Sequence, residues 1–243
     1  MLSLFLIQKD RFHFYKHQFF LNILLSFFGV YIEVSILQIF ADDDIAVLIY
    51  VLIANTITTS LTTGRIPDFC KAIKKGEIIR YYIRPLSLFH HVLIEEIGNS
   101  LYQLFQMLPL ILFACLLQKP NLFQILWFIL ALLLSLILAA LLSVCIFALS
   151  LPLANFAATK ALLTCITAFF SGGMIPLMMM PDFFQKIAYV TPFAFLVDGV
   201  VQVFHHQHVF SIIGAQVCWI MIFYLVGSIV FAYCEKKLQV FGG

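Results

Sequence analysis

Charged residues are scarce in this sequence. Asp, Glu, Lys and Arg together make up 11% of the 243 residues, whereas hydrophobic residues make up 63%. A soluble domain carries about 25% charged residues and at most about half apolar ones, so this composition excludes a soluble globular protein. The 27 Phe and nine Tyr residues also exclude a disordered chain, because such a chain could not leave so much apolar surface in water.

Two chemical signatures are also missing. The sequence contains no Gly-x-x-x-x-Gly-Lys-Ser/Thr run, the loop that cradles the phosphates of a nucleotide. It contains no Cys-x-x-Cys pair either, and its six cysteines are dispersed along the chain. We therefore expect no disulfide framework, no metal site and no cofactor held by this chain itself.

Long uncharged runs are what the sequence has in abundance. A bilayer core of about 30 Å requires about 20 apolar residues in a helix. Six runs answer to this description: 19–40, 45–63, 97–117, 122–150, 157–180 and 209–234. The sequence therefore predicts an all-α polytopic membrane protein, a single domain over residues 1–243 with six transmembrane helices.

The distribution of Lys and Arg predicts the topology. Twelve of the 14 fall in the amino-terminal segment, the loop 64–96, the region after the fourth span and the carboxyl-terminal tail, whereas Lys119 and Lys186 fall on the other side. Because short cytoplasmic loops retain positive charge, we expect both termini to be cytoplasmic. Residues 1–18 have the mixed basic and apolar character of an interfacial helix on that leaflet.

The stretch 181–208 is apolar but cannot span. Pro181 and Pro192 interrupt it, and Asp198 lies in its second half. We expect two short helices that re-enter the membrane from the outer side before the last span, with protein around their non-helical backbone.

The loop 64–96 predicts a short amphipathic helix. Pro67 and Asp68 suit its start, and Lys74, Lys75 and Gly76 suit its end. Its apolar stripe consists of Phe69, Cys70, Ala72 and Ile73. Because a helix this short is marginal alone in water, the stripe requires either a lipid surface or another protein, and the residues leave both open.

Two sequence blocks resemble a known family. The run GEIIRYYIRPLS at 76–87, after a second span and an amphipathic helix, resembles the cytoplasmic loop of ABC-2 type permeases, the membrane subunits of ATP-driven exporters. The run SGGMIPLMMMPDFFQKIAYVTPFAFLVDGV at 171–200 is similar to that family's Ser-Gly, Pro, Met-Pro and aromatic-Pro signature. Together with the span pattern, the resemblance covers nearly the whole chain.

The resemblance implies a function and partners. Such permeases pair with a second copy or a paralogue and bind a separate ABC ATPase subunit, which holds ATP and Mg. This chain would be the non-catalytic permease subunit of an exporter in a bacterial plasma (inner) membrane, in contact with lipid and with no nucleic acid. Its ATPase-coupling contacts would be Phe69, Ile73, Lys74, Gly76, Glu77, Arg80 and Arg84. The substrate stays open among drug, peptide, lipid and glycan.

Polar residues within the apolar runs are candidates for a substrate path. We expect the path to include Glu33, Asn55, Thr59, Gln103, Ser171 and Asp198. The competing interpretation is hydrogen bonding between helices, which also places such residues in membrane spans. The sequence leaves the two open.

Two alternative functions remain. An ion-coupled secondary transporter would place ionisable residues within its spans, and Glu33 and Asp198 are the candidates. An intramembrane enzyme would use a cluster such as the one in the run HHVLIEEIGN at 90–99. That run matches no zinc motif, and we expect His90, His91, Glu95 and Glu96 to be solvated at the headgroup level without a catalytic role.

A second histidine cluster comes before the last span. His205, His206 and His208 invite a metal site, but no acidic or cysteine ligand lies nearby in the sequence. We expect a hydrated interfacial cluster there, of unassigned role.

Overall fold

The computed structural model describes residues 16–38, 44–62, 87–150 and 156–241. The long helices in these ranges are α2 (Lys16–Leu37), α3 (Asp44–Thr62), α6 (Leu88–Gln118), α7 (Leu122–Ser150), α8 (Phe156–Phe170) and α11 (Val209–Phe241). Between α8 and α11 lie the 3-10 turn η2 (Leu177–Met179) and the short helices α9 (Asp182–Val190) and α10 (Asp198–Phe204). The described ranges contain no strand, which confirms the all-α prediction.

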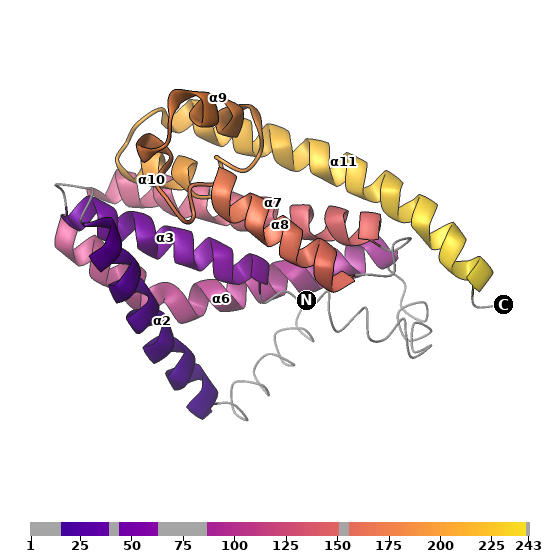
Figure 1. The fold of residues 1–243 in the computed structure, drawn as a ribbon, viewed down its shortest axis with the longest axis horizontal. Coiled ribbons are helices and arrows are strands. Elements are labelled where there is room, and N and C mark those ends of the chain that lie inside the picture. Colours follow the sequence, from indigo (N-terminus) through magenta and orange to yellow (C-terminus); the bar gives the residue numbers. More distant parts are fainter. Residues whose placement is uncertain (1–15, 39–43, 63–86, 151–155, 242–243) are drawn as a thin grey trace.

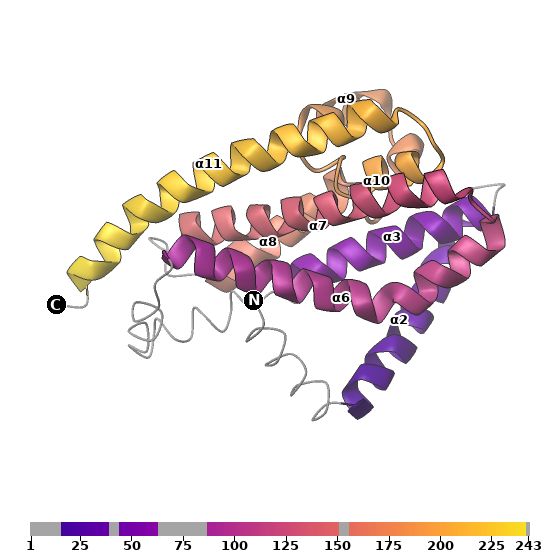
Figure 2. The ribbon, with the colours of Figure 1, turned by 180° about the vertical axis from the view of Figure 1, so that it is seen from behind.

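The long helices form an elongated bundle. α3, α6, α7 and α11 run along its long axis, and α2 crosses obliquely with its first residues standing away from the rest (Figures 1 and 2). Residues 171–208, which we call the cap, lie at one end, beside the start of α3 and the end of α6. The cap therefore closes one end of the bundle, and α11 carries the chain back to the opposite end.

α7 is the central helix. It contacts α3, α6, α8, α10 and α11, and its second half is buried on almost every face. Small side chains, among them Ala139 and Ala140, let neighbouring helices approach closely. Its start is fixed locally, because the Gln124 side-chain oxygen accepts a hydrogen bond from the Asn121 backbone N–H at 2.9 Å.

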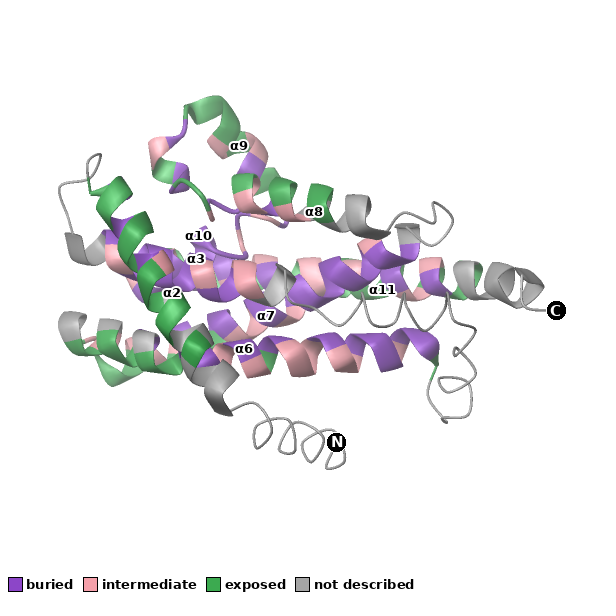
Figure 3. Ribbon diagram, turned by 60° about the horizontal axis from the view of Figure 1, so that its bottom comes forward, coloured by how far each residue is buried: buried purple, intermediate pink, exposed green. Residues whose placement is uncertain are grey.

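α2 is the most exposed of the long helices. Figure 3 colours most of its described residues as exposed, in contrast to α3 and α7. Large apolar side chains make up this face: Leu21, Leu24, Leu25, Phe27, Phe28, Tyr31, Ile32 and Ile36. Such a surface requires lipid or another apolar partner.

Two of the described helices are long and apolar enough to span a bilayer. These segments are Leu122–Ala148 in α7 and Val209–Tyr233 in α11, and shorter apolar segments occur at Phe27–Leu37 and Val47–Thr59. The predicted run 122–150 coincides with α7, and 45–63 coincides with α3 to within one residue at each end. The count of six crossings stays a prediction.

The fifth predicted span is too long. α8 ends at Phe170 rather than at 180, and Lys160, assigned to the preceding loop, lies in its second turn. The helix stops because Gly172 adopts a left-handed conformation with φ of 81°. Residues 171–180 are apolar, and hydropathy alone did not separate this turn from the helix.

Helix α6 begins before the third predicted span. α6 starts at Leu88, so residues 88–96 of the expected loop are helical. Leu88, Phe89, Val92 and Leu93 pack against α7 and α11 and hold this first part of α6 to the bundle. The sixth predicted run, 209–234, agrees with the apolar segment Val209–Tyr233 to within one residue, and its helix α11 continues to Phe241.

The cap contains the two short helices that the sequence predicted. Residues 192–197 between them are not helical, so the second helix begins at Asp198 instead of enclosing it. The amino-terminal helix expected over 1–18 lies outside the described residues up to residue 15, and Lys16 already belongs to α2.

Gly227 in α11 marks a close approach of three helices. A Cβ atom added there would lie 2.9 Å from both Cys145 Sγ of α7 and Phe89 Cε2 of α6. A glycine at this point lets three helices meet.

We therefore expect Gly227→Leu to destabilise the bundle by about 1–3 kcal/mol through overpacking. Gly214→Leu is the control, because nothing lies within 4 Å of a Cβ at that position of the same helix. The measurement is the apparent unfolding temperature in detergent, followed by tryptophan fluorescence. Equal unfolding temperatures for the two variants would contradict the close approach.

Candidate functional site: the polar cluster of the cap

Asp198 is the centre of a buried polar cluster in the cap. Only 5% of its surface is exposed. The Tyr189 hydroxyl donates a hydrogen bond to Asp198 Oδ2 at 2.5 Å, and Gln202 Nε2 donates to the same oxygen at 2.6 Å. The last turn of α9 and the first turn of α10 are thereby joined through one carboxylate.

The local sequence explains this arrangement. Asp198 and Gln202 are four residues apart on α10 and so share a helix face, while Thr191 and Pro192 end α9 and turn the chain back. Gln202 Nε2 also lies 2.6 Å from the Tyr189 hydroxyl, which closes the cluster.

Burial raises the pKa of the Asp198 carboxyl, and the hydrogen bonds from Tyr189 and Gln202 oppose that rise. Burial and the bond to Asp198 likewise raise the pKa of the Tyr189 phenol, which therefore stays a hydrogen-bond donor. The cluster is a satisfied structural unit, with both donors committed to one acceptor.

Two further side chains tie the cap to the bundle. Ser135 Oγ of α7 donates to the Leu196 carbonyl at 2.6 Å. Gln216 Nε2 of α11 donates to the Phe195 carbonyl at 2.9 Å and to the Ala131 carbonyl at 3.2 Å. Residues 195 and 196 are not in a helix, so these side chains satisfy carbonyls that have no helical partner.

Sequence reasoning missed Ser135 and Gln216. Each is an isolated polar residue inside a long apolar run, and each is fully buried. That isolation was the available signal, because a lone hydrogen-bonding side chain in an apolar helix needs a specific partner.

The six predicted path residues do not gather in one place. The Asp198 backbone N–H donates to the Ser171 carbonyl at 3.4 Å, so these two meet in the cap. Thr59 Oγ1 donates to the Asn55 carbonyl at 2.6 Å within α3. This hydrogen bond lies within α3 and not between helices, so it supports neither the path nor the competing interpretation for Thr59.

The remaining path residues are spread over three helices. The Asn55 amide nitrogen would lie 3.8 Å from a Cβ on Gly29, which places it where α2 meets α3. Gln103 is buried on α6. Glu33 is exposed on α2, one turn before the helix ends at Leu37.

The predicted ATPase contacts lie outside the described residues. Phe69, Ile73, Lys74, Gly76, Glu77, Arg80 and Arg84 all fall within 63–86. α3 ends at Thr62 and α6 begins at Leu88, on either side of this segment.

The histidine and glutamate cluster of α6 is not solvated as expected. His91 and Glu96 are only 4% and 2% exposed, and His91 Nε2 lies 3.8 Å from Glu95 Oε1. The prediction was wrong for His91 and Glu96, because the apolar residues beside them pack this part of α6 against the bundle. Among the described residues, no group of three or more His, Cys, Asp or Glu side chains could hold a metal ion.

His90 has a different role from its neighbour. One ring nitrogen lies 2.6 Å from Ser87 Oγ and the other 2.9 Å from the Tyr224 hydroxyl of α11. The imidazole therefore bridges the start of α6 to α11.

The second histidine cluster lies in the loop between α10 and α11. His206 and His208 are exposed, both with positive φ, and the His206 ring faces Phe123 with centroids 6.5 Å apart. Its interfacial role stays a prediction.

The fold and the cap define a class of protein. A helical bundle with an extensive exposed apolar surface, two described helices long and apolar enough to span a bilayer, and a cap of short helices has the features of a membrane-embedded protein. The chain belongs to the ABC-2 type transporter family, whose sequence profile matches residues 4–205. It is a permease of the ABC-2 type. The match includes both blocks that carried the resemblance, and no curated protein matches the chain.

We expect Asp198→Ala to loosen the cap. The substitution leaves the Tyr189 hydroxyl and the Gln202 amide without their acceptor, at a cost of about 1–3 kcal/mol. Amide hydrogen exchange over 182–204 should accelerate by about tenfold. Asp198→Asn should accelerate exchange less, because its amide oxygen still accepts a hydrogen bond.

Asp182→Ala is the matched control, since Asp182 is an exposed aspartate at the start of α9. Similar exchange for Asp198→Ala and Asp182→Ala would contradict the role of the cluster.

Proposed function

We propose that this chain is the permease subunit of an ABC-2 type exporter in the plasma membrane, where it forms the transmembrane path and couples to a separate ATPase subunit. One observation carries the proposal. The family match over residues 4–205 includes the segment 63–86 and residues 171–205 of the cap, and α3, which packs against the cap, ends at Thr62, directly before that segment. ATP hydrolysis by a subunit bound at this segment would then change the path through α3.

The proposed topology has six crossings with both termini in the cytoplasm. α2, α3, α6, α7, α8 and α11 would be the crossing helices, and the cap would lie on the outer side. α8 has 15 residues, about 22 Å of helix, which is less than the bilayer core. Its crossing would therefore be completed by the turn 171–176, whose Ser171, Gly172 and Pro176 are buried in protein.

The proposal includes pairing with a second permease copy or a paralogue. Glu33 supports it, because the carboxylate is exposed on a helix face rich in exposed apolar side chains such as Tyr31 and Ile32. A charged group facing lipid costs several kcal/mol. A partner copy or a hydrated path along α2 would remove that cost.

The exported molecule remains open among drug, peptide, lipid and glycan. Glu33 would also fit an ion-coupled secondary transporter, so this residue does not distinguish that function from ATP-driven export. The presence of a bound ATPase subunit does. An ATPase subunit that co-purifies with the chain supports export driven by ATP.

We expect the segment 63–86 to recruit the ATPase through its apolar stripe. Phe69→Asp or Ile73→Asp places a charge where an apolar side chain worth about 1.5–3 kcal/mol would be buried. Recovery of the ATPase with affinity-tagged permease from native membranes should fall by about tenfold or more. Lys71→Gln should change it little, because an exposed charge contributes at most about 1 kcal/mol.

Equal permease expression and an unchanged oligomeric state are the controls for that comparison. If both aspartate variants retain the ATPase, the helix is a lipid-surface element, and the ion-coupled transporter becomes the better hypothesis.

The topology makes a separate prediction. Single cysteines introduced at Asp42 and Lys119 should react with a membrane-impermeant maleimide in intact cells, whereas those at Lys75 and Val240 should react only after permeabilisation. The background is a variant with the six native cysteines replaced. Labelling of position 240 in intact cells would restore a seventh crossing and reject the proposed arrangement.

A further inference from the structure

The turn that follows α8 packs directly against α3. Both glycines of the Ser-Gly-Gly run make this contact. A Cβ atom added to Gly172 would overlap the Tyr50 hydroxyl oxygen, and one added to Gly173 would lie 3.1 Å from the Thr58 methyl group. Tyr50 and Thr58 are eight residues apart and so lie on the same side of α3. The glycine pair therefore lets the turn lie flat along that side.

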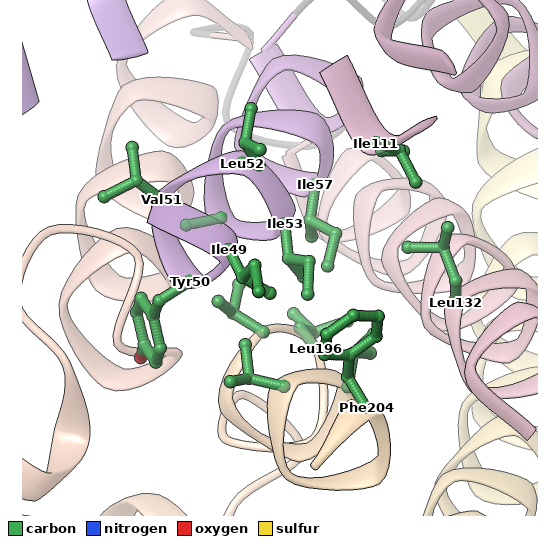
Figure 4. Packing of buried hydrophobic residues seen from close by; sticks show 14 of the residues in the cluster. Ile49, Tyr50, Val51, Leu52, Ile53, Ile57, Ile111, Leu132, Leu196 and Phe204 are labelled. Carbon is green, nitrogen blue, oxygen red and sulfur yellow. The ribbon is translucent and has the colours of Figure 1, made fainter. Parts of the chain in front are cut away.

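Tyr50 lies at the centre of this contact between the turn and α3. It is a buried residue on α3, and in Figure 4 its ring turns away from the isoleucines of the same helix toward a neighbouring segment of the chain. Leu177 also borders this point, since its Cγ would lie 3.2 Å from a Cβ on Gly172. The phenol fills the gap between α3 and the two ends of the turn.

The contact depends mainly on shape. The Tyr50 hydroxyl has no partner at full hydrogen-bond geometry among the described residues, and the backbone of Leu177 interacts with its oxygen. The ring fills the space beside the turn, and the hydroxyl oxygen is the atom that a Cβ on Gly172 would meet. A phenylalanine at this position would keep the ring in place.

α3 also packs against the second half of the cap. Ile49 and Ile53 pack in one cluster with Leu196 and Phe204 of the cap, as Figure 4 shows from close by. α3 then runs to Thr62 and leads into the segment 63–86. A displacement at that end reaches the cap through one continuous helix.

We propose that Tyr50 is a positioning residue, through which α3 sets the place of the cap by the insertion of its phenol beneath Gly172. The proposal rests on the proposed function in one respect: the displacement that α3 carries would originate at the ATPase. The contact between Tyr50 and the turn itself does not depend on that function, and the two parts are tested separately.

The first test is a double-mutant cycle on the purified permease in nanodiscs. Gly172→Ala should accelerate amide exchange over 171–180 by about tenfold or more, because the methyl group meets the Tyr50 hydroxyl. Tyr50→Phe removes that oxygen and should by itself change exchange little. The double variant should exchange more slowly than Gly172→Ala alone, although not at the wild-type rate, since alanine remains strained at φ of 81°.

Gly173→Ala supplies the matched control. Its methyl group meets Thr58 and not Tyr50, so Tyr50→Phe should leave the exchange of Gly173→Ala unrelieved. If the Tyr50→Phe, Gly172→Ala double variant exchanges as fast as Gly172→Ala or faster, Tyr50 does not seat the turn and the proposal fails.

The second test uses the permease in complex with its ATPase. Addition of ATP and vanadate should change exchange over both 63–86 and 171–180 in the wild type. Tyr50→Leu should keep the first response and lose the second, measured below the unfolding temperature of the variant, which the cavity left by the ring lowers. A persisting response of the cap in Tyr50→Leu would overturn the positioning role. No response at either segment in the wild type would contradict the proposed function and the displacement through α3, and the cycle would still decide whether Tyr50 holds the turn.

Discussion

The structure depends on one constraint, which is that backbone polar groups in an apolar environment need partners within the protein. In the long helices, backbone N–H and C=O groups bond to one another along the helix. In the cap, residues 192–197 are not helical, so their backbone groups need partners from elsewhere in the protein. Ser135 and Gln216 supply hydrogen bonds to the carbonyls of residues 196 and 195 from α7 and α11. Residues 195 and 196 are therefore held by donors that lie within two other helices.

This constraint gives the cap two kinds of attachment. Its contacts to α7 and α11 are hydrogen bonds with defined donors and acceptors, which resist sliding. Its contacts to α3 are made by side-chain shape, through Tyr50 beneath Gly172 and the isoleucines against Leu196. Attachments that differ in this way let the turn after α8 follow α3 while residues 195 and 196 keep their hydrogen bonds to α7 and α11. Within the cap, Asp198 keeps α9 and α10 together during such a motion.

Hydropathy predicted the central helices well and their ends less well. α7 was predicted to the residue because Pro120 and Asn121 precede an uninterrupted apolar run. The end of α8 was missed because the left-handed Gly172 lies among residues as apolar as the helix. The start of α6 was missed because His and Glu were read as solvated, whereas the neighbouring apolar side chains bury His91 and Glu96. The pair Tyr50 and Gly172 could not be found at all, since no local pattern relates residues so far apart in the chain.

The two carboxylates that were predicted to line the path lie in opposite environments, one buried and one exposed. Asp198 is buried and accepts hydrogen bonds from Tyr189 and Gln202, so the chain itself compensates its removal from water. Glu33 is exposed near the same end of the bundle, on a helix whose other exposed side chains are mostly apolar. What stabilises Glu33 must therefore come from outside the single chain, as water or as a second copy. Of the two carboxylates, Asp198 belongs to the internal construction of the cap, and Glu33 marks the surface at which the protein meets its surroundings.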